Sequence, residues 1–148
     1  MSEQPDPFNL NRFVEAQAGS YGAALAELHS GRKTGHWIWY VFPQLRGLGR
    51  SATSEVYGLA GIAEAVAYLR HPVLGPRLRE AVAAISSQGS RSAASILGDL
   101  DAMKLRSCLT LFHAAEPGEM LFSAALQQFF AGQPDSRTLQ LIAAQSGA

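Results

Sequence analysis

The sequence predicts an all-α protein, folded as a single compact domain of about six or seven helices. Alanine and leucine, both strong helix formers, recur along most of the chain. Alternating runs of β-branched residues, which are typical of half-buried strands, are almost absent. Glycine and proline divide the chain into segments of helical length. With 148 residues, the chain can bury a core without disulfides or a structural metal.

The first helix is expected within residues 8–30, after a short leader over residues 1–7. Two glycines near its middle are expected to interrupt it, and Gly31 is expected to end it. The helical domain as a whole is expected to extend over residues 8–146.

Residues 31–51, with the sequence GRKTGHWIWYVFPQLRGLGRS, are expected to form an irregular segment that is both aromatic and basic. Its six apolar residues 37–42 could form a buried strand or a helical turn, because periodicity cannot distinguish the two at that length. Pro43 is expected to end whichever structure they form.

The second half of the chain reads as a series of helices. Residues 54–70 are expected to form one helix that ends before Pro72, because the residue before a proline is disfavoured in the helical region. Pro76 suits the first turn of the next helix, and a Gly/Ser-rich link follows it. Asp99 is the expected N-cap of the helix after the link. The last two helices are expected within residues 118–132 and 135–145.

The helix that follows Tyr57 has two distinct faces. One face is apolar and is expected to be core; it carries Leu59, Ile62, Val66 and Leu69. The opposite stripe combines aromatic, small and acidic residues; it carries Tyr57, Gly61, Glu64 and Tyr68. This stripe could line a cleft, with the tyrosines as flat walls and the carboxylate as an orienting group. The alternative is that both tyrosines pack on neighbouring elements.

Asp101 and Lys104 lie within the apolar arc of the helix that contains Cys108. Charged residues on such a face are rarely buried unless they are paired or functional. A spacing of three residues lets the two side chains reach each other. A partly desolvated lysine could act as a base or an amine nucleophile. The alternative is that Asp101 interacts with the helix dipole and Lys104 extends into solvent.

Composition and missing motifs exclude several classes of function. Twelve basic residues balance twelve acidic ones, which disfavours nucleic acid and anionic membranes as partners. The N-terminus lacks the features of a signal peptide, and no apolar run approaches the roughly 20 residues that cross a bilayer. A cytoplasmic protein is therefore expected. Cys108 is expected to be a core thiol, and the four histidines lack metal-ligand spacing, so neither metal nor cofactor is expected.

The segment 31–51 is the best candidate for a ligand site. Between Glu27 and Glu55 the chain has no acidic residue, but it carries four basic ones, Arg32, Lys33, Arg46 and Arg50. Aromatic faces could stack on a flat group, and exposed backbone amides before a helix suit phosphate or carboxylate. The pattern indicates a flat, anionic, nucleotide-like small molecule. The alternative is that the tryptophans are core and the basic residues are solvated.

Three motifs, KTGHWIWYVFPQLRGLGRS, EAVAYLRHPVLGPRL and DAMKLRSCLTLF, resemble the domain of unknown function 1810 family. These are small bacterial helical proteins that are sometimes labelled calpastatin, and the likeness runs from about Phe8 to Leu141. The resemblance implies an all-α single domain, and it implies no activity and no catalytic residue. Size and helical makeup also resemble the NADAR proteins, which act on ADP-ribose linkages.

The sequence therefore predicts a protein that binds, and could also act on, a nucleotide-like or ADP-ribose-like anionic ligand in a basic, aromatic-lined cleft. The predicted ligand-binding residues are Arg32, Lys33, Trp37, Trp39, Gln44, Arg46, Arg50, Ser51 and Tyr57. The predicted catalytic residues, for a reaction at a glycosidic carbon, are Lys104, Asp101 and the candidate acid/base His36.

The alternative is a non-catalytic module for protein–protein interaction or homo-oligomerisation, in which exposed tryptophan and arginine act as hot spots. The sequence leaves open the oligomeric state, and it leaves open whether segments 31–51 and 101–112 share one pocket.

Overall fold

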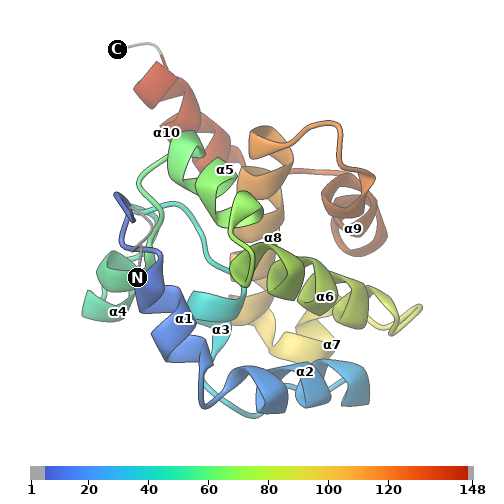
Figure 1. The fold of residues 1–148 in the computed structure, drawn as a ribbon. Helices are drawn as coiled ribbons and strands as arrows, with labels where there is room; N and C mark the ends of the chain where they lie inside the picture. The colour runs from blue at the N-terminus through green and yellow to red at the C-terminus, as the bar shows by residue number, and fades with distance from the viewer. Residues whose placement is uncertain (1–5, 147–148) are drawn as a thin grey trace.

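The computed structural model describes residues 6–146 and has ten helices there, with no strand among them (Figure 1). The helices are α1 Asn11–Gln17, α2 Tyr21–Ser30, α3 Ile38–Val41, α4 Ala52–Tyr57, α5 Ile62–Arg70, α6 Leu74–Ser86, α7 Ala93–Leu97, α8 Asp99–Ala115, α9 Met120–Phe130 and α10 Ser136–Ser146. The all-α prediction is confirmed. The number exceeds six or seven because the helices predicted within residues 8–30 and over residues 54–70 are each two helices, and because α3 and α7 are short helices that were not predicted as such. Most of the predicted leader lies outside the described residues.

The first predicted helix is divided at residues 18–20 into α1 and α2, near the glycines expected to interrupt it. Gly31 ends α2 as predicted. Its φ of +80° is in the left-handed region, where glycine is favoured, and its amide donates to the carbonyl of Leu28.

The single helix predicted over residues 54–70 is instead two helices, α4 and α5, separated at Gly58. The backbone of Leu59 pairs there with the segment 44–46: its amide donates to the carbonyl of Gln44 and its carbonyl accepts from the amide of Arg46. A Cβ on Gly58 would lie 2.7 Å from the Cα of Arg46. The helix breaks because this close approach, which an intact helix would prevent, satisfies backbone groups of both segments.

The start of α8 also differs from the prediction. Asp99 is the first helical residue, and the N-cap position belongs to Gly98, whose φ is +90°. Gly98 is the single residue that connects α7 to α8, and a residue with a side chain would be strained in that conformation. The prediction of Asp99 as N-cap is therefore wrong.

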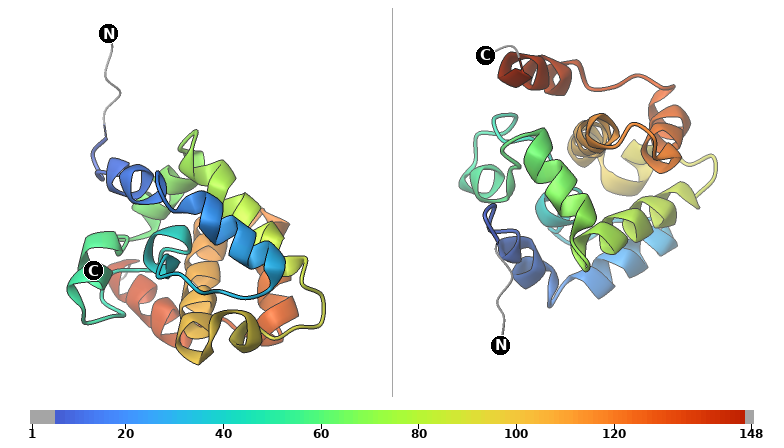
Figure 2. Two further views of the ribbon diagram at one scale, coloured as in Figure 1. Left: turned by 90° about the horizontal axis from the view of Figure 1, so that it is seen from below. Right: turned by 45° about the horizontal axis from the view of Figure 1, so that its top comes forward.

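Helix α8 is the centre of the fold and packs against α5, α7, α9 and α10 (Figure 2). Its inner face is fully buried and consists of Leu105, Cys108, Leu109, Leu111 and Phe112. Burying a side chain of this size contributes roughly 1.5–3 kcal/mol. Burial raises the pKa of the Cys108 thiol, so the expectation of an unreactive core cysteine is confirmed.

The predicted stripe is not one helical face: Tyr57 ends α4 and is half-buried, whereas Glu64 and Tyr68 lie on α5 and are buried beneath α1. Tyr68 is fully buried and meets the Phe13 ring edge-on at 5.2 Å between centroids. Glu64 is also buried and forms an ion pair with the Arg12 guanidinium at 2.8 Å. The packing alternative is therefore correct for this face, because α1 brings a guanidinium and an aromatic ring to cover it.

Candidate functional site

A cavity of about 300 Å³ opens between the segment 39–49, the outer face of α8 and the start of α10. Its lining residues are Trp39, Gln44, Leu48, Gly49, Leu100, Met103, Lys104, Ser107, Asp135 and Arg137. The two motifs that are distant in the sequence, 31–51 and 101–112, thus contribute to one cavity. Its volume lies at the lower end of the range for small-molecule sites.

Both tryptophans belong to the single helical turn α3, with Trp37 as its N-cap and Trp39 within it. Trp37 is 2 % exposed and packs in the core near Phe42, so the core alternative is correct for this residue. Trp39 is only half-buried and reaches the cavity. The apolar residues 37–42 therefore form a helical turn that presents one tryptophan to the core and the other to the cavity.

Glu27 fixes the loop that leads into α3. Its Oε1 atom accepts hydrogen bonds from the amides of Thr34 and Gly35 and from Nε1 of Trp37, at 2.6, 2.9 and 2.9 Å. Burial alone would raise the pKa of Glu27, but these hydrogen bonds outweigh it and hold the pKa below its usual range. Glu27 is the last acidic residue before the basic stretch, and the sequence analysis did not identify this role.

Asp101 forms ion pairs with two lysines. Its Oδ1 lies 2.8 Å from Nζ of Lys104, and its Oδ2 lies 2.7 Å from Nζ of Lys33. The predicted contact of Asp101 with Lys104 is confirmed, and Lys33 joins it from the other motif. Burial would raise the pKa of Asp101, but hydrogen bonds and charge from the two lysines outweigh it and lower the pKa.

Each lysine of this cluster also lies over an indole ring. Nζ of Lys104 is 4.5 Å from the ring centroid of Trp39, and Nζ of Lys33 is 5.2 Å from that of Trp37. The Lys33 side chain is 8 % exposed and also donates to the Gly35 carbonyl, whereas Lys104 is more exposed and lines the cavity. An ion-paired lysine suits binding of an anion better than attack as a free amine.

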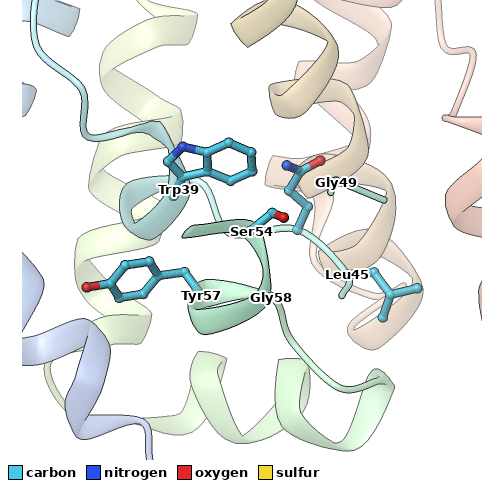
Figure 3. A pocket seen from close by; sticks show the side chains of 7 residues that line it. Trp39, Leu45, Gly49, Ser54, Tyr57 and Gly58 are labelled. Atoms are coloured by element: carbon cyan, nitrogen blue, oxygen red, sulfur yellow. The ribbon is translucent and has the colours of Figure 1, made fainter. Parts of the chain in front are cut away.

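Gln44 is nine-tenths buried, yet its side-chain amide makes no hydrogen bond to any described residue. Among the described residues only Nδ1 of His113 is a buried side-chain polar atom without a hydrogen-bond partner, so the amide atoms of Gln44 keep contact with solvent and are accessible to a molecule in the cavity. Gln44 also lines a second, smaller cavity of about 10 Å³, which is the size of one water. Trp39, Ser54 and Tyr57 surround that small cavity, with Ser54 between the two aromatic residues (Figure 3).

Three of the predicted site residues line the main cavity: Trp39, Gln44 and Lys104. Lys33 and Asp101 lie directly behind Lys104. Tyr57 lines only the small cavity and packs on Phe13 and Tyr40.

The other predicted site residues lie outside the cavity lining. Arg32, His36 and Arg50 are exposed. Arg46 donates to the carbonyls of Glu55 and Gly58 and so holds the α4–α5 connection. Ser51 is the N-cap of α4 and accepts the amide of Ser54 at 3.1 Å.

Several lining residues were not found from the sequence. Asp135 and Arg137 come from the start of α10, which no local pattern connects with the segment 39–49. Leu100 and Met103 are 74 % and 63 % exposed on the outer face of α8. Large apolar residues on the solvent-facing side of a helix, next to a lysine, indicate a binding surface and could have identified these two residues from the sequence.

Over residues 6–146 no three His, Cys, Asp or Glu side chains are grouped as a metal site would require. No helix in the same range has the length and apolar character needed to cross a membrane.

Comparisons with known proteins give a family and a fold. A family model described as "Protein of unknown function (DUF1810)" matches residues 7–142. The crystal structure of the conserved hypothetical protein Rv1873 from Mycobacterium tuberculosis is similar over 93% of this chain and 99% of that chain, with 48% sequence identity and a TM-score of 0.90. No curated protein matches the chain.

Proposed function

This chain belongs to the DUF1810 family, and we propose that it binds a small, flat, anionic ligand of the nucleotide type in the cavity between residues 39–49, α8 and α10. The observation that carries the proposal is the position of Lys104. Its ammonium lies at the cavity wall, 4.5 Å from the Trp39 ring, while Asp101 holds it in place. Ligand sites combine an apolar surface with a few fixed polar groups in this way.

The charges around the cavity leave a positive excess. Three cations, Lys33, Lys104 and Arg137, face two carboxylates, Asp101 and Asp135. Because Asp101 is shared by two lysines, it cannot neutralise both of them. An anionic group that binds near Lys104 is therefore attracted by the remaining positive charge.

The remaining walls suit a flat, partly polar group. Trp39, Leu48, Leu100 and Met103 supply apolar surface, and the side chains of Leu100 and Met103 are largely exposed to solvent. Covering this surface with a ring would contribute roughly 25 cal/mol for each Å² removed from water. The unpaired amide of Gln44 adds a donor and an acceptor that can recognise the edge of a base.

The proposal is a binding function, and catalysis at a glycosidic bond is not included in it. Such a reaction needs a group that moves a proton within the cavity. The lowered pKa of Asp101 makes it a poor proton acceptor, and His36, the predicted acid/base, is exposed outside the lining.

The test is a thermal-shift and calorimetric titration with AMP, ADP-ribose and ribose 5-phosphate. A ligand at about 100 times its Kd should stabilise the wild type by about 3 kcal/mol, which raises Tm by several degrees. Lys104→Ala should lose most of this shift. Arg70→Ala is the matched control, because Arg70 is an exposed cation on α5 outside the cavity, and it should keep the shift. If none of the three compounds shifts the wild type, the proposal is wrong.

A second candidate is a protein-interaction surface, and the exposed Leu100 and Met103 beside Trp39 favour it. Sedimentation of the wild type, Trp39→Ala and Lys104→Ala separates the two functions. If the face joins two copies of the chain, Trp39→Ala should change the oligomeric state. If the face is a ligand site, the oligomeric state should stay unchanged while both variants lose the same ligand.

A further inference from the structure

We propose that Asp135 makes the cavity selective for ligands that carry a sugar with adjacent hydroxyl groups, such as the ribosyl group of a nucleoside phosphate; this rests on the proposed function. Asp135 lies at the start of α10 and lines the cavity on the wall that α10 contributes. A carboxylate accepts hydrogen bonds and donates none, so it recognises hydroxyl groups and repels phosphate.

The Asp135 carboxylate is held rigidly from two sides. Its backbone amide donates to Oγ1 of Thr110 at 2.9 Å, which attaches it to α8. Its Oδ2 accepts both the amide and the hydroxyl of Thr138, at 2.9 and 2.6 Å. Thr110 and Thr138 are both buried, so the carboxylate has little freedom to turn.

Helix capping accounts for only one oxygen of Asp135. Oδ2 is the capping oxygen, whereas Oδ1 accepts no hydrogen bond from the described residues and has no cation within ion-pair distance among them. Asp135 lines the cavity and its Oδ1 has no protein partner among the described residues, so this oxygen can accept a hydrogen bond from a ligand. The nine-tenths-buried Gln44 lines the same cavity, and its side-chain amide has no partner among the described residues, so it offers a ligand there a further donor and acceptor.

The cavity therefore has two polar ends with opposite preferences. Lys104, supported by Asp101, is fixed on α8 and attracts an anion. Asp135 is fixed at α10 and attracts hydroxyl donors. A sugar phosphate satisfies both ends at once, whereas an anion without hydroxyl groups leaves Oδ1 of Asp135 without a donor.

The test compares AMP with its 2′,3′-dideoxy counterpart by calorimetry on the wild type and on Asp135→Asn. Asparagine is as good an N-cap as aspartate, and Thr138 needs an acceptor, so the amide oxygen should keep the cap and the NH₂ should face the cavity. The wild type should bind AMP about 10- to 100-fold more tightly than the dideoxy compound, and the variant should lose this preference. Asp99→Asn, which makes the same charge change at an exposed position outside the cavity, should retain the preference.

The outcomes separate this inference from the proposed function. If the wild type binds both compounds equally, or if Asp135→Asn weakens both equally, the selectivity assigned to Asp135 is wrong while the ligand site stands. If the wild type binds neither compound, and neither ADP-ribose nor ribose 5-phosphate, both proposals fail. Circular dichroism and Tm of the variant in the absence of ligand verify that the cap of α10 is intact.

Discussion

Glu27 and Asp101 show how single carboxylates position the candidate site. Each one collects donors from segments that the sequence separates: Glu27 binds the amides before α3, and Asp101 binds one lysine from each motif. Both carboxylates have a lowered pKa because the donors favour the ionised form. The position of Lys104 at the cavity is thus a product of charge pairing as much as of helix geometry.

Glu27→Gln should destabilise the protein by about 1 kcal/mol at neutral pH, because a partly exposed charged hydrogen-bond acceptor is replaced by a neutral one. The folded pKa of Glu27 lies below its unfolded value of about 4.5, so its contribution is present above that pH and is lost as the pH falls through the folded pKa. Measured by urea unfolding between pH 7 and pH 3, the free energy of unfolding of the variant should therefore fall less with decreasing pH than that of the wild type. The same pH dependence in the variant and the wild type would mean that the contribution of the Glu27 hydrogen bonds to stability does not depend on its charge.

At the scale of elements, periodicity was a good guide to the long helices and a poor one to the short ones. Helices α6, α8 and α9 carry enough turns for an apolar face to be recognised, and they were predicted within a few residues. Helix α3 and the α4–α5 break were not resolved, because tertiary contacts decide both of them. The pairing of Leu59 with Gln44 and Arg46 is such a contact, and no local pattern encodes it.

Gly58→Ala tests whether this close approach forces the break between α4 and α5. The added Cβ would lie 2.7 Å from both the Cα of Arg46 and the carbonyl oxygen of Ser54, so the variant should lose about 1–3 kcal/mol through overpacking. Gly22→Ala is the matched control, since Gly22 lies in α2 with no atom near its Cβ position. That change should be neutral or stabilise by up to about 1 kcal/mol. Equal effects of the two changes in urea unfolding would show that the approach at Gly58 is not tight.

At the scale of the whole molecule, the candidate site exists only because three distant segments meet. The sequence identified Trp39, Gln44 and Lys104 by their residue types, but it also selected Arg32, His36 and Arg50, which the fold leaves outside the cavity. It missed the contribution of α10 entirely. Residue type shows which side chains can bind a nucleotide-like ligand, whereas only the packing of α8 between its neighbours decides which of them share a cavity.

Substitutions on the inner face of α8 should therefore lower stability, whereas substitutions on its outer face should weaken ligand binding. Leu105 is fully buried in the core, and Leu100, on the same helix, is 74 % exposed at the cavity. Leu105→Ala should cost about 2–5 kcal/mol of unfolding free energy, because it leaves a cavity in the centre of the fold. Leu100→Ala should change stability by less than about 0.5 kcal/mol and should weaken AMP binding measurably, because it removes part of the apolar wall. Urea unfolding and calorimetry on both variants measure the two effects. A Leu100→Ala variant that binds AMP as the wild type does would show that Leu100 does not contact the ligand.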